Sequence, residues 1–371
     1  MDFSYSEEQR MLTDSLRRVI ADHWSFAQRR ERQRAGVMDV GCWRNLAGLG
    51  VAGLLVPQEY GGFGETPATM LAVHRELGRG LVSEPVIPSA VMAVTLLAHG
   101  QNEALKAQWL AAHAEGDAVL ALAWQEEGER YATRALCTHV EPVDGGLRLD
   151  GRKILVWHAQ SAQAMIVSAL IDGEMALVLV PRDAPGLTIA DYPTFDGARA
   201  ATLTFEGVRL EAGQLIARGA EAHALLTLAL DYGVTALCAH ACGAMEALTE
   251  TTIQYLKTRK QFGQPLANFQ VLQHRLADMV IQQEMALSVT YVAVVGLGED
   301  DVARRSRLVS MSKVEVAAAA RFVGESAVQL HGGMGVTDEL EVGDFFKRLT
   351  YADILLGDTN FHLQRMQDLG N

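Results

Sequence analysis

Basic residues are scarce in this sequence relative to acidic ones. Lysine and arginine number 32 against 45 aspartate and glutamate residues, which gives a formal net charge of −13 at pH 7. A nucleic-acid surface needs a basic stripe, so this balance argues against nucleic acid as a partner. It does not exclude a small anionic ligand, because a local cluster of arginines and backbone N–H groups can hold a phosphate on an acidic protein.

Cysteine is also rare, with four residues in a chain of 371. That number does not form the disulfide framework of a small secreted domain. Cys238, His240 and Cys242 are close enough in sequence to suggest metal ligands. On a helix, however, the two cysteines share a face and His240 points well away from it. We interpret them as buried helix residues and expect no metal site.

Long apolar runs are missing as well. The sequence has no uninterrupted apolar stretch long enough to span a bilayer. Its first twenty residues, MDFSYSEEQRMLTDSLRRVI, are charged and amphipathic and have no apolar core of the signal-peptide type. We therefore expect a cytoplasmic protein that does not act at a membrane.

What the sequence does contain is three segments of different periodicity. Residues 1–116 have apolar residues at helical spacing, with Ser6 as a candidate cap before the first helix. Residues 117–214 change to short runs rich in Val, Ile, Leu and Thr, separated by turn residues such as Pro185-Gly186. This middle pattern predicts a compact antiparallel sheet or barrel.

Residues 215–371 return to helical periodicity. Long helices are predicted at 221–258, 267–297 and 299–329, and a shorter one ends the chain. Long antiparallel helices with short joints predict a four-helix bundle. We therefore expect an α+β fold of three domains, with boundaries near residues 116 and 214.

The segment TRKQFGQPLANFQVLQHRLADM, residues 258–279, is the most specific stretch of the sequence. Arg259 and Lys260 suit the C-terminal end of a helix, where cations interact favourably with the helix dipole. Gly263 would then stop the helix and Pro265 would prevent its continuation. The alternative is a ligand site in which the Arg259 guanidinium clamps a phosphate and Phe262 supports a planar ring.

A second segment, QLHGGMGVTDELEVGDFFKRL at residues 329–349, places Gly332, Gly333 and Gly335 after a long helix. Glycine permits positive φ and a close approach of the backbone to a ligand. Taken alone, the pattern favours a glycine-rich helix terminus over a cofactor site.

In this order and at this separation, the two segments together resemble the acyl-CoA dehydrogenase family of flavoproteins. The run from Arg259 to Met279 matches the family's R-K-x-F-G…F-Q…L-A-D-M pattern, and Gln329–Gly335 matches its Q-x-x-G-G-x-G pattern. The earlier stretch VPQEYGGFG and the helical–β–helical order are also similar to this family. The resemblance covers the whole chain and implies the acyl-CoA dehydrogenase fold.

The resemblance implies FAD bound between subunits, an acyl-CoA thioester as substrate and an electron-transfer flavoprotein as electron acceptor. In the family reaction a carboxylate removes the α-proton while the flavin accepts a hydride from the β-carbon, which needs a base whose pKa is raised by burial. The matched positions give the candidate cofactor-binding residues: Arg259, Gln261, Phe262, Gln270, Gln329, Gly332 and Gly333.

The chain departs from the family where the base belongs. One family position for the glutamate base precedes the last helix and corresponds to Gly357. The other lies on the long helix, ten residues before Gly243, and corresponds to Gly233. We therefore predict no catalytic residue in this chain, with Asp358 as the fallback candidate. Asp358 is also well placed to cap the last helix, and we favour that role.

The segments that resemble a chain's own flavin-ring site are altered too. In QEEGERYAT, residues 125–133, Glu126 and Gly128 match the family, but Tyr131 stands in place of a serine. LVWH, residues 155–158, replaces the family's W-I-T-N run. The retained motifs are those that serve a neighbouring subunit's flavin. The pattern indicates the small subunit of a heteromeric enzyme, similar to pimeloyl-CoA or steroid-type acyl-CoA dehydrogenases, in a heterotetramer with a homologous large subunit.

Two other interpretations stay open. The chain could be a self-associating, self-sufficient flavoenzyme with Asp358 as base, or a non-catalytic interaction protein on the same fold. Asp231 corresponds to a family aspartate near the acyl-CoA but suits a cap or buried pair equally well. His274 is interpreted as an interface residue rather than a flavin contact, and Lys313 as a structural residue between helices. The sequence does not predict which acyl group is used.

Overall fold

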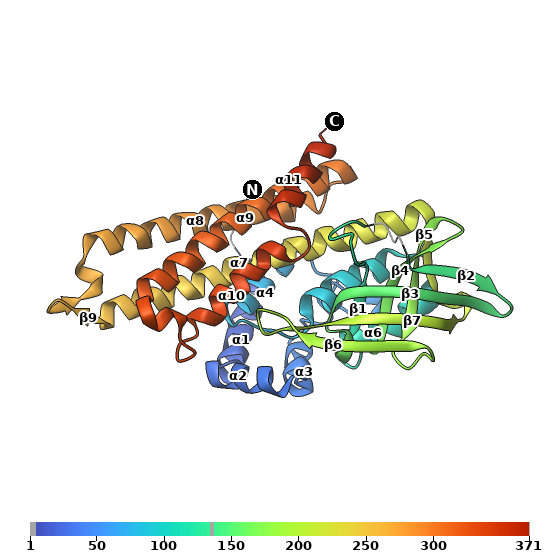
Figure 1. The fold of residues 1–371 in the computed structure, drawn as a ribbon, viewed down its shortest axis with the longest axis horizontal. Helices are drawn as coiled ribbons and strands as arrows, with labels where there is room; N and C mark the ends of the chain where they lie inside the picture. Colours follow the sequence, from blue (N-terminus) through green and yellow to red (C-terminus); the bar gives the residue numbers. More distant parts are fainter. Residues whose placement is uncertain (1–4, 134–136, 371) are drawn as a thin grey trace. The chain divides into compact units, whose positions relative to one another are not determined.

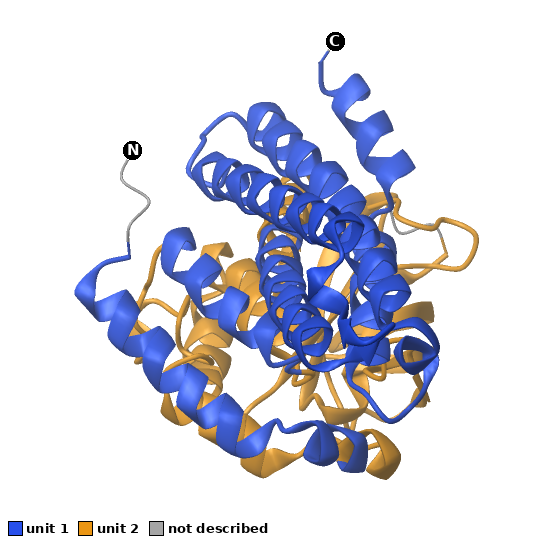
Figure 2. Ribbon diagram, turned by 90° about the vertical axis from the view of Figure 1, so that its left-hand side faces the viewer, with its two compact units in different colours: residues 1–31, 67–82, 234–371 blue, residues 32–66, 83–233 orange. Residues whose placement is uncertain are grey.

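The computed structural model describes residues 5–133 and 137–370. The chain forms two compact units, drawn in two colours in Figure 2. One unit takes residues 1–31, 67–82 and 234–371, and the other takes residues 32–66 and 83–233. Each unit is therefore assembled from separate stretches of the sequence.

The first unit is helical. Its helices are α1 (Glu7–His23), the start of α2 (Phe26–Ala35), α4 (Pro67–Arg79), the second part of α7 (Gly219–Thr258), α8 (Gln270–Gly296), α9 (Val302–His331), α10 (Val342–Ile354) and α11 (Thr359–Asp368). Helices α8 and α9 run side by side (Figure 1), and α9 also packs against α10 and α11. The predicted long helices at 221–258, 267–297 and 299–329 are confirmed.

Short polar side chains set the ends of these helices. Ser6 accepts the N–H of Gln9 while the Gln9 side chain accepts the N–H of Ser6, so the predicted cap of α1 is a capping box. Asp301 accepts the N–H groups of Ala303 and Arg304 at the start of α9. In both helices an otherwise unpaired donor of the first turn gains a partner.

Two glycines let α4 and α7 touch through their backbones. A Cβ atom at Gly78 would lie 1.9 Å from the carbonyl oxygen of His240, and one at Gly243 would lie 1.8 Å from that of Arg75. Real Cβ atoms do not approach oxygens so closely, so only glycine permits this separation of the two helices. The crossing places the arginines of α4 beside the glutamates of α7.

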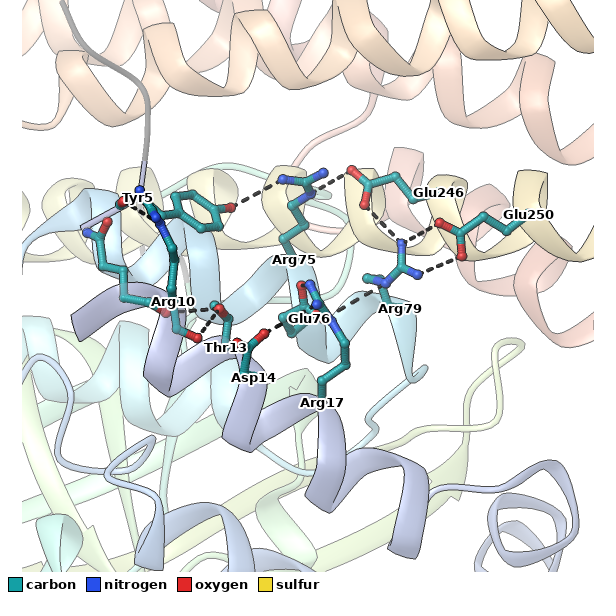
Figure 3. A network of polar contacts seen from close by, with 11 residues as sticks. Tyr5, Arg10, Thr13, Asp14, Arg17, Arg75, Glu76, Arg79, Glu246 and Glu250 are labelled. Carbon is teal, nitrogen blue, oxygen red and sulfur yellow. Dashed lines mark hydrogen bonds and ion pairs between the residues drawn. The ribbon is translucent and has the colours of Figure 1, made fainter. Parts of the chain in front are cut away.

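A network of ion pairs ties α1, α4 and α7 together (Figure 3). Arg75 contacts Glu246 at 2.6 Å, and Arg79 bridges Glu246 at 3.2 Å and Glu250 at 2.6 Å. On the other side of α4, Arg17 of α1 contacts Glu76 at 2.6 Å. The side chains of Glu76 and Glu246 are buried. Removing Arg17 or Arg75 would therefore leave a buried carboxylate without part of the positive charge that stabilises it.

The second unit holds the sheet. Its helical segments are the end of α2, α3 (Val40–Gly48), the π-helical η2 (Val86–Ala93), α5 (Val94–His99), α6 (Glu103–Ala114) and the start of α7. Its strands are β1 (Leu120–Ala123), β2 (His139–Val143), β3 (Gly146–Trp157), β4 (Ala164–Ile171), β5 (Glu174–Pro181), β6 (Leu187–Pro193), β7 (Arg199–Leu210) and β8 (Leu215–Arg218). Residues 134–136, which precede β2, lie outside the described residues.

The strands pair in the order β6-β7-β3-β2-β4-β5-β8, with β1 joined to β4. Most neighbours are antiparallel, as predicted, but β1 and β2 both pair with β4 in parallel. The sheet is therefore mixed rather than wholly antiparallel. Two parallel neighbouring strands need a long connection between them, and here β2 and β3 lie between β1 and β4 in the sequence.

Among the described residues, two helices are long and apolar enough to cross a membrane by length and composition, namely α7 and α8. In α7, 83% of the most apolar 18-residue stretch is buried, which is the burial of a core helix. In α8 the corresponding value is 33%. The sequence predicted no membrane-spanning segment because charged and polar residues interrupt the apolar stretches of both α7 and α8.

Candidate functional site

Five of the seven predicted cofactor-binding residues line one groove of the helical unit. The groove has a volume of about 620 Å³, within the usual range for small-molecule sites. It lies where α7 leads into the hairpin of β9 (Lys260–Gln261) and β10 (Gln264–Pro265), and where α9 ends. The five residues are Arg259, Gln261, Gln329, Gly332 and Gly333.

The hairpin shapes one wall of the groove. Helix α7 ends at Thr258, and Gln261 pairs with Gln264 across a two-residue turn of Phe262 and Gly263. Both turn residues have positive φ, 54° and 82°, as a type I′ hairpin turn requires. The expectation that Gly263 stops the helix was therefore wrong. The helix ends five residues earlier, and Gly263 supplies the left-handed second position of the turn.

The glycines at the end of α9 have two different roles. Gly332 ends the helix with φ +60°, and a Cβ at Gly332 or Gly333 would meet nothing within 4 Å. A Cβ at Gly335, in contrast, would lie 2.7 Å from the carbonyl oxygen of Val328. Packing therefore requires glycine only at Gly335. At Gly332 and Gly333 the missing side chains leave the backbone open to the groove.

An aromatic pair lies in the groove. The rings of Tyr255 and His331 stack at a centroid distance of 4.3 Å, and the Tyr255 hydroxyl donates to the His331 carbonyl at 3.3 Å. Burial lowers the pKa of His331, although its bond to the Ala327 carbonyl opposes that shift. The imidazole is thus uncharged at neutral pH. Positive charge in the groove comes from the exposed Arg259 and Arg275.

Two guanidinium groups beside accessible backbone suit an anionic ligand with a planar part. Guanidinium groups bind phosphate oxygens in pairs, and the open glycines allow close approach. Arg275, Tyr255 and His331 were not among the predicted residues. For His331, the available signal was its position directly before the predicted glycines. For Arg275, the signal was its spacing of one helical turn after Val271 on α8.

Phe262 and Gln270 do not line the groove. Phe262 is 90% exposed at the hairpin tip and contacts only the edge of Phe269 among the ring pairs of the described residues, at 6.1 Å. Gln270 is exposed at the start of α8. His274 is exposed one turn further along the helix.

The second predicted feature, the loop before α11, is a tightly bonded helix joint. Asp358 caps α11, because its Oδ1 accepts the Phe361 N–H at 2.8 Å. His362 is fully buried, and its ring bonds to Ser310 Oγ at 3.0 Å and to the Leu356 carbonyl at 3.1 Å. The expected capping role of Asp358 is confirmed. The His362 ring is directed to those two groups instead of forming a pair with the Asp358 carboxylate.

Backbone geometry at this joint favours glycine. Leu356 and Gly357 both have positive φ, 58° and 114°. A Cβ at Gly357 would lie 2.5 Å from His362 Nε2 and 2.5 Å from Phe361 Cδ1. The Lys313 ammonium fixes the same loop by donating to the Asp353 and Gly357 carbonyls at 2.9 and 2.7 Å. Lys313 is thus a structural residue, as predicted.

Charges in the loop region do not provide a base. Burial lowers the pKa of His362 to about 3, and the nearby Lys313 adds to the effect. Burial also lowers the pKa of Lys313 to about 8. His362 is therefore uncharged at neutral pH, and both of its ring nitrogens are hydrogen-bonded. Lys313 donates its hydrogen bonds to two backbone carbonyls.

In the sheet unit, Glu126 has a structural environment. Its carboxylate accepts the N–H groups of Cys137 and Thr138 and a 2.7 Å bond from Lys153. Burial alone would raise the pKa of Glu126, but Lys153 and these donors lower it to about 2. Tyr131, which stands in the family's serine position, is buried under Arg130. Glu126 therefore organises its loop.

Cys238, His240 and Cys242 are all buried on α7, as predicted. They have separate surroundings. His240 Nε2 faces an Arg348 nitrogen at 3.2 Å, whereas Cys242 Sγ contacts Thr290 Oγ1 at 3.5 Å. Burial raises the pKa of both thiols to about 12. Asp231 is fully buried on the same helix.

Comparison with known proteins points to one family. Two family models match the chain, "Acyl-CoA dehydrogenase, N-terminal domain" over residues 6–117 and "Acyl-CoA dehydrogenase, C-terminal domain" over residues 223–368, which together cover more than half of it. Human short-chain specific acyl-CoA dehydrogenase, mitochondrial, is 27% identical over 339 residues, 88% of this chain and 81% of that protein.

Solved structures agree with this relationship. A chain of the ChsE4–ChsE5 complex from Mycobacterium tuberculosis has a TM-score of 0.90 at 25% identity, covering 99% of this chain and 98% of that chain. A chain of the Tcur3481–Tcur3483 steroid ACAD variant has a TM-score of 0.88 at 29% identity, covering 98% and 97%.

Proposed function

The chain belongs to the acyl-CoA dehydrogenase family, and on that premise we propose that it is the small subunit of a heteromeric, FAD-dependent acyl-CoA dehydrogenase. The reaction is the conversion of an acyl-CoA thioester to the 2-enoyl-CoA. One observation carries the proposal: the groove at Arg259 and Gly332–Gly333 is formed and open, while glycine stands at Gly357, where the family's base belongs.

The groove fits the cofactor that the family implies. The Arg259 and Arg275 guanidinium groups would hold the pyrophosphate of FAD, and the open backbone at Gly332 and Gly333 would lie against it. When bound, FAD supplies the acceptor for the hydride that leaves the β-carbon. Gln261 and Gln329 provide amide donors and acceptors in the same groove. Phe262, exposed on the hairpin, and Gln270 would contact the cofactor or the chain that holds it.

The α-proton needs a carboxylate that this chain does not provide at either family position. Gly233 and Gly357 carry no side chain, and the Asp358 carboxylate is engaged as a helix cap. We place the base in a homologous large subunit. Electrons would pass on to an electron-transfer flavoprotein, and we place the complex in the cytoplasm.

The similar structures support an assembly of unlike chains. Both the ChsE4–ChsE5 complex and the Tcur3481–Tcur3483 complex contain two different proteins, and the second is a steroid enzyme. Several chains would shape the acyl pocket. The acyl group itself is left for a substrate screen.

The test is to produce the chain alone and together with a homologous dehydrogenase that contains the glutamate base. The expected result is a yellow complex with FAD and enoyl-CoA formation, whereas the chain alone retains little flavin and does not turn over. In the complex, Arg259→Ala should lower FAD content, and Arg44→Ala, at an exposed arginine of α3, is the matched control.

Two outcomes would replace the proposal. Flavin retention and turnover by the chain alone would identify a self-sufficient enzyme, for which Asp358 is the candidate base. A preparation that stays colourless with FAD and with every homologous partner would indicate a non-catalytic interaction protein.

A further inference from the structure

The connection between α9 and α10 begins with the two open glycines of the groove, Gly332 and Gly333. It then becomes acidic before α10 completes its first turn. We call three of these acidic residues the acidic set: Asp338, Glu341 and Asp344. Glycine has more conformational freedom than any other residue, so contacts on either side have to fix the course of this backbone.

Two arginines of α2 contact the acidic set. Arg29 Nη2 lies 3.0 Å from Glu341 and 3.9 Å from Asp344. Arg30 Nη2 lies 3.1 Å from Asp338 and 3.0 Å from Asp344. The two guanidinium groups therefore share Asp344 and together reach all three carboxylates. In the sequence, 312 positions separate Arg29 from Glu341, so only tertiary folding brings these segments together.

Both arginines are ordered by residues of their own segment. Arg29 donates to the Trp24 carbonyl at 3.2 Å, and its side chain is buried. The Arg30 guanidinium lies 5.2 Å from the centre of the Phe26 ring, and its side chain is 22% exposed. Ion pairs between exposed, flexible side chains contribute little to stability. Side chains that are ordered and partly buried lose less entropy and are less screened, so these contacts constrain the acidic set more strongly.

The Asp344 carboxylate depends on these two arginines. Among the described residues, its Oδ2 atom is buried and accepts no hydrogen bond. Burial raises the pKa of Asp344, and the charges of Arg30 and Arg29 oppose that shift. A buried carboxylate that loses a cationic partner is costly. Loss of either arginine should therefore displace the first turn of α10, because that movement brings Asp344 into solvent.

The start of the connection has an attachment of its own. The Tyr255 hydroxyl donates to the His331 carbonyl at 3.3 Å, directly before Gly332. Arg29 and Arg30 provide the attachment at the other end. A backbone that is attached at both ends samples fewer conformations than one attached only at its start. The open glycines of the groove lie between these two attachments.

We propose that Arg29 and Arg30 are positioning residues for the groove, which bind the acidic set and thereby fix the backbone of Gly332 and Gly333 for its ligand. A site that is in its binding conformation for only part of the time binds its ligand more weakly in proportion. Because FAD is the ligand of the proposed function, the expected effect on FAD affinity rests on that function. The effect on the backbone is a property of this chain alone.

Hydrogen exchange of the chain without cofactor tests the effect on the backbone. Arg30→Gln should make peptides that cover residues 332–345 exchange several-fold faster, while peptides of α8 remain unchanged. The matched control is Arg152→Gln, which removes a 2.8 Å ion pair with Glu127 in the other unit. It should leave the exchange of residues 332–345 unchanged. Equal exchange of this segment in the parent and the Arg30→Gln variant would overturn the proposal.

FAD titration of the complex with the large subunit tests the effect on the groove. Arg30→Gln should raise the Kd for FAD about tenfold, as expected if the binding conformation is populated about a tenth of the time. Arg30→Lys retains the positive charge and should recover part of the affinity. A purely stabilising role would lower the unfolding temperature and leave the Kd of the folded complex unchanged, which would overturn the proposal.

The two measurements separate this inference from the proposed function. A parent complex that binds no FAD would contradict the proposed function, and the exchange of residues 332–345 would still decide whether the arginines fix the backbone. If Arg30→Gln does not fold, Asp338→Asn takes its place, because that carboxylate is 85% exposed and can be neutralised without a buried vacancy. Asp338→Asn should have the same effects at about a third of the size, and an absence of both effects would overturn the proposal.

Discussion

At the scale of single residues, Asp358 is a helix cap, and its neighbour Gly357 stands at the position that corresponds to the family's glutamate base. Its carboxylate accepts the Phe361 N–H at 2.8 Å. Asp358→Ala removes that acceptor and should reduce the free energy of unfolding by about 1 kcal/mol, measured by urea denaturation. Asp358→Asn keeps a capping oxygen, so its stability should stay close to that of the parent.

The same pair of variants separates capping from catalysis. The complex with the large subunit should retain turnover with Asp358→Asn, because the cap persists and the base lies elsewhere. Lost turnover in a stable, flavin-containing Asp358→Asn complex would make Asp358 the base and contradict the proposed division of labour.

Gly357 is a position that accepts no side chain in the present joint. Its φ is +114°, and a Cβ would collide with the rings of Phe361 and His362. Gly357→Glu should therefore destabilise the protein by about 2 kcal/mol or more, measured by denaturation. Gly343→Glu, at a helical glycine with open space around it, serves as control. An equal, small effect of both substitutions would show that the loop moves easily.

Residue roles were predictable where they depend on local rules. The caps at Ser6 and Asp358 follow from residue type at a helix start. The contribution of Arg275 and the stacked Tyr255 and His331 to the groove was not predictable in this way. Those side chains belong to three helices, and only tertiary packing brings them together.

At the scale of secondary-structure elements, the crossing of α4 and α7 depends on Gly243. A Cβ there would lie 1.8 Å from the Arg75 carbonyl oxygen. Gly243→Ala should force the helices apart and lower the free energy of unfolding by about 2–3 kcal/mol, in spite of the better helix propensity of alanine. Thermal unfolding checks this prediction.

The control is Gly48→Ala in α3, where the added methyl group meets nothing within 4 Å. This variant should be neutral or slightly stabilised. If both substitutions had the same effect, the close approach of α4 and α7 would not be a constraint on position 243.

The long helices α7, α8 and α9 were predicted within a few residues because their periodicity extends over many turns. The hairpin after α7 was missed, since Gly and Pro signal a helix stop and a turn equally well. The parallel pairing of β1 and β2 with β4 was also missed. Strand patterns identify strands but contain no information on which strand becomes the neighbour.

At the scale of the whole molecule, buried uncharged histidines make stability depend on pH. Burial lowers the pKa of His74 to about 3, that of His113 to about 4 and that of His362 to about 3. Unfolded histidine titrates near 6.5. Below that pH the unfolded chain binds more protons than the folded chain, so stability falls as pH decreases from about 6.5 towards 4.

Each buried histidine should contribute up to about 1.4 kcal/mol of lost stability per pH unit below 6.5. Urea denaturation at pH 7, 6 and 5 would measure the slope. His74→Leu should flatten it, whereas His139→Leu, at an exposed histidine of β2, should not. An unchanged slope in the His74 variant would mean that His74 gains a proton without unfolding.

The fold class and the family were predictable from the whole sequence because two motifs and one order of elements agree. The domain boundaries near residues 116 and 214 remain a prediction. The way in which subunits assemble is the hardest feature to predict, because one sequence contains the residues of its own core but not those of a partner's surface.

The ammonium group of Lys313 has a chemical consequence beyond its two carbonyl bonds. With a pKa of about 8, Lys313 has a larger fraction of neutral, nucleophilic amine at neutral pH than an ordinary lysine, yet its side chain is only 1% exposed. Amine-reactive labelling followed by peptide mass analysis should modify Lys313 slowly and the exposed Lys257 and Lys260 quickly. The rate at Lys313 would then report how often the joint of α9, α10 and α11 opens, and rapid labelling in native protein would show that this joint is loose.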